Sequence, residues 1–203
     1  MPRAGETDRW PPKTNEIPDL SRLDTKLSLN VALNATFRAA GPIDRIARAL
    51  WINYVRLVDQ LIWEYEAARD ALQNYVATPN TTLSPLFRAV AHMETLVNTM
   101  RRGILFARRM RRHKGSPKIE KLYVLSESAG DRLVGVRNAI EHLENKILEG
   151  EIAQGEPTTL LVQSDRLELL GHEILYRELA DWAIQLHDLA IQLADYRDPA
   201  RST

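Results

Sequence analysis

The sequence predicts an all-α protein, an up-and-down bundle of four to five helices with a small β-hairpin inserted before the last helix. Three observations favour this class. Apolar residues recur at three- and four-residue steps over four long stretches, proline or glycine marks the breaks between them, and one short segment carries β-branched runs.

Residues 1–20 contain four prolines and few large apolar side chains, so we expect a disordered or loosely packed N-terminal tail. One helical domain is expected to follow over residues 21–198. Within it, residues 21–40 fit either a short helix or a partial strand.

The long helices are predicted from their apolar spacing and their end signals. The first begins at Pro42 and ends before Pro79, and the second begins at Ser84 and ends in a basic segment. The third ends near Glu149, where Gly150 suits the turn that closes a helix.

The segment 151–173 differs in kind from the helices around it. The runs Thr158–Val162 and Leu167–Leu170 are short and bounded by polar residues, which predicts the β-hairpin. The last helix is expected to begin near His172 and to end near Pro199.

Composition narrows the class of protein. The 203 residues include no cysteine, and 27 basic residues balance 27 acidic ones. There is no N-terminal apolar run typical of a secretory signal and no apolar stretch long enough for a membrane span, so a soluble, cytoplasmic protein without a membrane partner is expected. The histidines lack the spacing of a metal motif, so neither a metal site nor a cofactor is predicted.

Positive charge is concentrated in one place. Residues 101–121 hold nine Lys or Arg and one acid. The side chains that would bind RNA are Arg108, Arg109, Arg111, Arg112 and Lys114. The alternative interpretation is a solvated helix end, because cations near a helix C-terminus suit its dipole.

The third helix carries the residues that point most clearly to chemistry. On a helical wheel, Asn138 and His142 lie on the side away from the apolar seam, and Arg137 lies at its shoulder. Histidine can take and return a proton near neutral pH, and arginine can stabilise charge that builds on a phosphate. RNA brings its own nucleophile, the 2′-hydroxyl, so cleavage that leaves a 2′,3′-cyclic end needs no metal.

The string Arg137-Asn138-Ala139-Ile140-Glu141-His142 resembles the R-x(4–6)-H signature of the HEPN superfamily. The resemblance implies an all-α bundle over residues 43–197 that acts as a homodimer. It also implies a metal-independent endoribonuclease of a toxin–antitoxin or antiphage defence type, with an RNA substrate and an antitoxin or activator protein as partners. Arg137 and His142 carry over as the active pair, with Asn138 as their helper.

The family often adds a polar contact to the arginine from an earlier helix, for which Glu94 and Asn98 are the candidates here. Three alternatives stay open. Arg137 can pair with Glu141 on the surface while His142 is solvated. The fold can serve as a non-catalytic interaction module that binds a partner protein, a nucleotide or RNA, or it can be purely structural.

Overall fold

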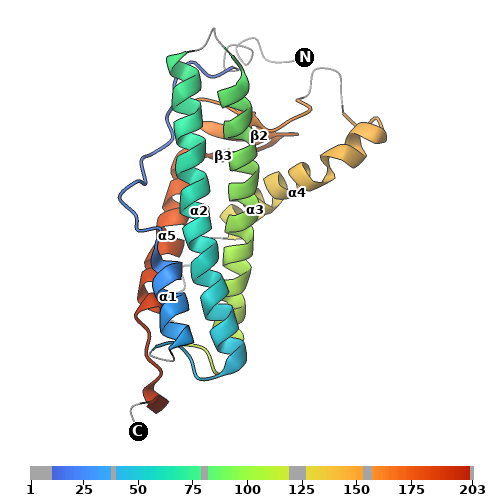
Figure 1. Cartoon of the computed structure of the whole chain (residues 1–203). Coiled ribbons are helices and arrows are strands. Elements are labelled where there is room, and N and C mark those ends of the chain that lie inside the picture. The colour runs from blue at the N-terminus through green and yellow to red at the C-terminus, as the bar shows by residue number, and fades with distance from the viewer. Residues whose placement is uncertain (1–10, 38–39, 79–81, 119–126, 153–156, 202–203) are drawn as a thin grey trace. The chain divides into compact units, whose positions relative to one another are not determined.

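The computed structural model describes residues 11–37, 40–78, 82–118, 127–152 and 157–201 (Figure 1). Within these ranges the helices are α1 (Leu27–Thr36), α2 (Arg45–Ala77), α3 (Ser84–Arg112), α4 (Glu127–Leu148), α5 (Tyr176–Ala194) and the short 3₁₀ turn η2 (Pro199–Arg201). The strands are β1 (Leu161–Val162), β2 (Arg166–Leu169) and β3 (His172–Leu175). The prediction of a mainly helical protein with a small antiparallel sheet before the last helix is confirmed.

The chain divides into two compact units. The first comprises residues 1–20, 64–98 and 125–180, and the second comprises residues 21–63, 99–124 and 181–203. Helices α2, α3 and α5 each contribute residues to both units. No helix in the described ranges combines the length and the apolar composition that crossing a bilayer requires.

Buried hydrogen bonds tie α2 to α5 in the second unit. The indole N–H of Trp51 donates to the carbonyl of Leu193 at 2.7 Å, and the hydroxyl of Tyr54 donates to the carbonyl of Leu186 at 2.9 Å. Both aromatic side chains are fully buried. Each bond satisfies a polar atom that burial would otherwise leave without a partner.

Residues 27–36, which the sequence left open between helix and strand, form the helix α1. Leu27 and Val31 lie four residues apart and are both buried, as one face of a helix requires. The N–H of Ser28 donates to the carboxylate of Asp59 at 2.7 Å, so a side chain of α2 satisfies a donor in the first turn of α1.

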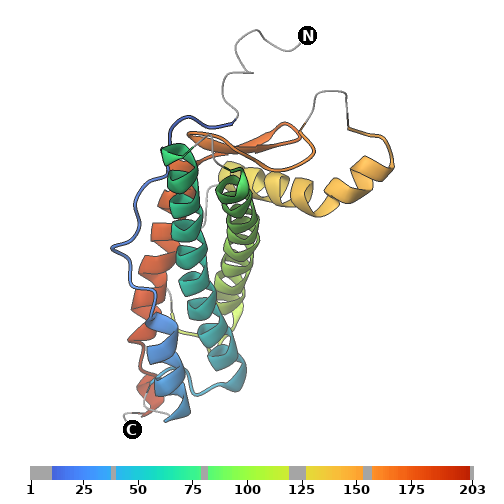
Figure 2. The same cartoon turned by 45° about the horizontal axis from the view of Figure 1, so that its top comes forward.

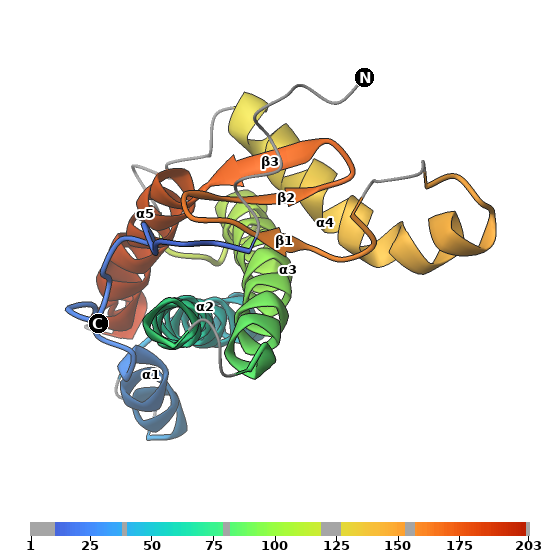
Figure 3. The same cartoon turned by 90° about the horizontal axis from the view of Figure 1, so that it is seen from above.

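The first unit contains the sheet, whose strand order is β1-β2-β3 and whose pairs are both antiparallel. β2 and β3 pack against α4, as Figure 3 shows from above. Leu167, Leu169 and Ile174 are buried.

The predicted hairpin is therefore incomplete, because the sheet has a third strand where the sequence predicted the start of the last helix. Leu170 (φ 49°) and Gly171 (φ 77°) form a two-residue turn with both φ values positive, which is the turn that fits the twist of a β-hairpin. It returns His172 and Glu173 alongside β2, and α5 begins only at Tyr176.

Part of the expected N-terminal tail packs on the first unit, whereas residues 1–10 lie outside the described residues. The side-chain amide of Asn15 donates to the carbonyl of Arg69 at 3.1 Å, and the N–H of Leu20 donates to the carboxylate of Glu66 at 2.6 Å. Ile17 and Leu20 are buried. This stretch is therefore anchored to α2.

Candidate functional site

Helix α4 contains the candidate catalytic residues, and its two halves differ in burial. Leu133, Val136 and Ala139 are buried, as one face of a helix that packs on a sheet should be. Further along, 48% of Ile147 and 85% of Leu148 are exposed. Figure 2 shows the C-terminal turns of α4 extending beyond the sheet.

Arg137 is held by two neighbours on its own helix. Its Nη1 donates to Oδ1 of Asn138 at 3.0 Å, and its Nη2 forms an ion pair with the carboxylate of Glu141, one turn later. The Arg137 side chain is 35% exposed. The guanidinium is thus fixed at the edge of the buried face while part of it stays open to a ligand.

His142 is exposed, and no hydrogen bond or ion pair joins it to any residue that the structure describes. Five residues separate it from Arg137, which places the two side chains about 140° apart around the helix axis. One chain does not bring them together. Their convergence across a cleft between two copies stays a prediction.

Sequence reasoning missed His172, which lies over α4 from strand β3. A Cβ atom at Gly135 would lie 2.6 Å from Nδ1 of His172, so a larger residue at position 135 would have to displace the imidazole from its place over α4. Gly135, Asn138 and His142 share one stripe of α4 at steps of three and four residues. The signal in the sequence was a glycine in the middle of a helix, where it weakens the helix unless packing demands it.

Arg137 was expected to receive a polar contact from Glu94 or Asn98 of an earlier helix. Within the described part of the chain, neither Glu94 nor Asn98 forms a hydrogen bond with Arg137, whose acidic partner is Glu141 of α4 itself. Desolvation by burial raises the pKa of Glu94 above its ordinary value.

The basic segment lies in the second unit, at the end of α3. Arg109, Arg111, Arg112 and Lys114 are exposed and Arg108 is half-buried. Among the described residues, no acid forms an ion pair with any of these five side chains. The arrangement leaves them available for an anionic ligand such as a phosphate backbone.

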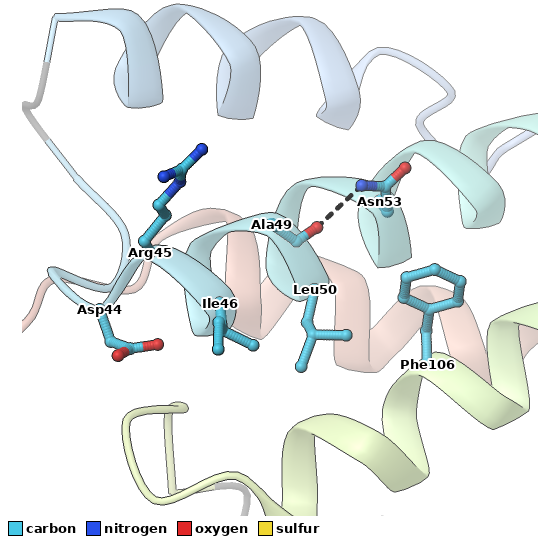
Figure 4. A pocket seen from close by; sticks show the side chains of 7 residues that line it. All are labelled: Asp44, Arg45, Ile46, Ala49, Leu50, Asn53 and Phe106. Atoms are coloured by element: carbon cyan, nitrogen blue, oxygen red, sulfur yellow. Dashed lines mark hydrogen bonds between the residues drawn. The ribbon is translucent and has the colours of Figure 1, made fainter.

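A groove opens beside this segment between the start of α2 and the later part of α3, with a volume of about 620 Å³. Figure 4 shows Ile46 and Leu50 pointing from α2 toward α3, and Phe106 pointing back toward α2. At one end, Asp44 accepts the N–H of Ala47 at 2.7 Å and so caps α2. The floor of the groove is therefore apolar.

A second cavity, of about 290 Å³, lies in the first unit beside the sheet. Here Arg166 makes two bonds of 3.0 Å to the carboxylate of Asp165 and one of 2.6 Å to that of Glu173. These hydrogen bonds raise the pKa of Arg166 above its ordinary value. Because these three hydrogen bonds already use donors of the guanidinium, Arg166 stabilises this part of the fold and has few donors left for a ligand.

A buried carboxylate of the first unit also has a histidine partner. Glu64 is buried, and Nδ1 of His92 lies 2.8 Å from its carboxylate. In the part of the chain that the structure describes, no three His, Asp or Glu side chains are grouped in a way that could hold a metal ion.

No family model, curated protein or solved structure matches the chain. The resemblance to the HEPN superfamily therefore rests on the motif residues of α4 and on the mainly helical fold that carries them.

Proposed function

We propose that this protein is a HEPN-like up-and-down helical bundle that acts as a homodimer and cleaves RNA without a metal ion. One observation carries the proposal. The guanidinium of Arg137 is oriented by the 3.0 Å hydrogen bond to Asn138, on a helix that exposes His142 one turn beyond Asn138. An oriented arginine and an exposed imidazole are the two groups that phosphate transesterification needs, once a second copy brings them together.

The reaction uses the nucleophile that RNA carries. The 2′-hydroxyl loses its proton to the imidazole of His142, and its oxygen forms a bond to the adjacent phosphorus. The bond from phosphorus to the 5′ oxygen breaks, and that oxygen gains a proton from an imidazolium. Arg137 stabilises the charge on the phosphorus oxygens. The products are a 2′,3′-cyclic phosphate and a 5′-hydroxyl.

A second copy completes the proposed site. One chain directs Arg137 and His142 to different sides of α4, and a twofold axis beside the helix would place an arginine of one copy near a histidine of the other. It would also supply two imidazoles, one to accept the proton and one to donate it.

The basic segment is the proposed contact for the RNA backbone. These side chains are Arg108, Arg109, Arg111, Arg112 and Lys114. Their positive charge favours phosphate binding, and no acid in the described ranges forms an ion pair with them. The toxin or antiphage role, and control by an antitoxin or an activator, are proposed on the resemblance of the motif.

The test is incubation of the purified protein with end-labelled RNA in EDTA. We expect cleavage to 2′,3′-cyclic ends, and its loss in both Arg137→Ala and His142→Ala while circular dichroism stays unchanged. Arg88→Ala removes another exposed arginine and is the matched control, which should cleave normally. Cleavage that persists in either motif variant would refute the assignment.

The second candidate is a non-catalytic interaction module that binds a partner protein, a nucleotide or RNA. The ion pair between Arg137 and Glu141 favours it, because this pair occupies the guanidinium without a substrate. RNA binding without cleavage in the same assay would select this function.

A further inference from the structure

The C-terminal half of α4 and the turn after it, residues 141–151, form an acidic segment that we call the α4 arm. It contains four glutamates and one lysine. Ile147 and Leu148 are exposed at its end, next to exposed Glu144, Glu149 and Glu151. Figure 3 shows the arm extending away from the sheet. Two large apolar side chains at the tip of an acidic helix are typical of a segment that docks on another surface.

The arm is ordered to its end. The N–H of Gly150 donates to the carbonyl of Ile147 at 3.2 Å, and the N–H of Glu151 donates to that of Lys146 at 3.0 Å. Gly150 has a φ of 69°, so these bonds form a Schellman turn. Because the helix is already formed, docking would cost little conformational entropy.

The groove between α2 and α3 matches the apolar tip of this arm. Its charged lining residues, Asp44 and Arg45, have opposite signs, so the positive charge comes from α3 beside it. Its floor is apolar, and Ile46 is 59% exposed there. On α3, exposed Arg102 and Arg109 lie one turn before and one turn after Phe106, on the same face of the helix.

We propose that the groove of one copy binds the α4 arm of a second copy. Ile147 and Leu148 would enter the groove against Phe106, and Glu144 and Glu151 would face Arg102 and Arg109. Arg102 and Arg109 are two turns apart on α3, whereas Glu144 lies on α4 and Glu151 lies in the turn that follows it. The proposed exchange is reciprocal, so that the arm of each copy enters the groove of the other and the two contacts close a twofold dimer.

The apolar floor favours this occupant over nucleic acid, because a phosphate backbone gains nothing from contact with Ile46, Leu50 and Phe106. The proposal does not depend on nuclease activity. It concerns how two copies associate, whereas the cleavage assay concerns the chemistry of α4.

The experiment exchanges the charges of arm and groove. The arm variant is Glu144→Arg with Glu151→Arg, and the groove variant is Arg102→Glu with Arg109→Glu. Light scattering on a sizing column gives the mass of each variant and of their equimolar mixture, after residual RNA has been removed by nuclease treatment. In a mixed pair, both contacts regain opposite charges, whereas each variant alone meets like charges twice.

We expect wild type to elute as a dimer, at twice 23.1 kDa. Each variant alone should have a dimer dissociation constant raised at least about tenfold, and the mixture should return to the wild-type value. The control Arg56→Glu with Arg88→Glu reverses two exposed arginines outside the groove and should stay dimeric.

Three results would overturn the proposal: a monomeric wild type, dimeric single variants, or a mixture that stays monomeric. A monomeric wild type would also count against the nuclease proposal, because the proposed cleavage site needs a second copy. A dimer that exchanges as expected but leaves RNA uncleaved would refute the nuclease proposal alone. Because Arg109 is also a proposed RNA contact, the outcome for the groove variant is its mass and not its RNA binding.

Discussion

The close approach of His172 to Gly135 allows a quantitative test of how β3 packs on α4. In an unconstrained helix, replacing glycine by alanine stabilises by about 1 kcal/mol. At position 135 the added methyl would lie 2.6 Å from Nδ1 of the exposed His172 side chain, so the imidazole would have to leave its present rotamer, at a cost of about 0.5–1.5 kcal/mol. We therefore expect Gly135→Ala to change the free energy of unfolding by no more than about 0.5 kcal/mol in either direction.

The cost should disappear when the imidazole is removed. In a His172→Ala background, Gly135→Ala should raise the free energy of unfolding by about 1 kcal/mol, which gives a coupling energy of about 0.5–1.5 kcal/mol between the two positions. Urea unfolding of the four proteins measures this cycle. Gly130→Ala on the same helix is the control, because its Cβ would meet nothing within 4 Å and its effect should not depend on His172. Equal effects of Gly135→Ala in both backgrounds would refute the packing described above.

Three further predictions concern other parts of the chain. Tyr54→Phe removes the hydroxyl that donates to the carbonyl of Leu186, a residue inside α5, and should lower the free energy of unfolding by about 0.5–1.5 kcal/mol in urea titrations; no change would contradict a buried bond there. Desolvation raises the pKa of Glu66 in the folded state, so the folded state holds more protons than the unfolded one just above the ordinary glutamate pKa. Stability should therefore fall as pH rises through that window, and Glu66→Gln should reduce the fall; a wild-type slope in the variant would count against this pKa shift. If Arg111 and Arg112 contact RNA phosphates, replacing either by alanine should reduce the slope of log affinity against log salt by about 0.7 for single-stranded RNA. An unchanged slope would exclude that contact.

The local features of the chain could be predicted from the sequence. The three- and four-residue spacing of apolar positions predicted α2, α3, α4 and α5, because such spacing lines up one face of a helix whatever the face contacts. Gly150 was predicted to close α4, and the structure places it there with a positive φ because only the local backbone decides that turn. Asn138 accepts a hydrogen bond from Arg137, whereas its role in positioning a catalytic pair stays a prediction.

Contacts between residues far apart in sequence could not be predicted. Residues 172–175 form a strand because Leu170 and Gly171 fold them back onto β2, although the apolar spacing continues into α5 and suggested an earlier helix start. The groove exists only where Ile46 of α2 comes close to Phe106 of α3, 60 residues later. Periodicity gives the direction of each side chain around its own helix, so the sequence determined the helices and the candidate residues on α4. Which side chains meet across elements depends on the packing of the whole chain, and only the tertiary structure decided it.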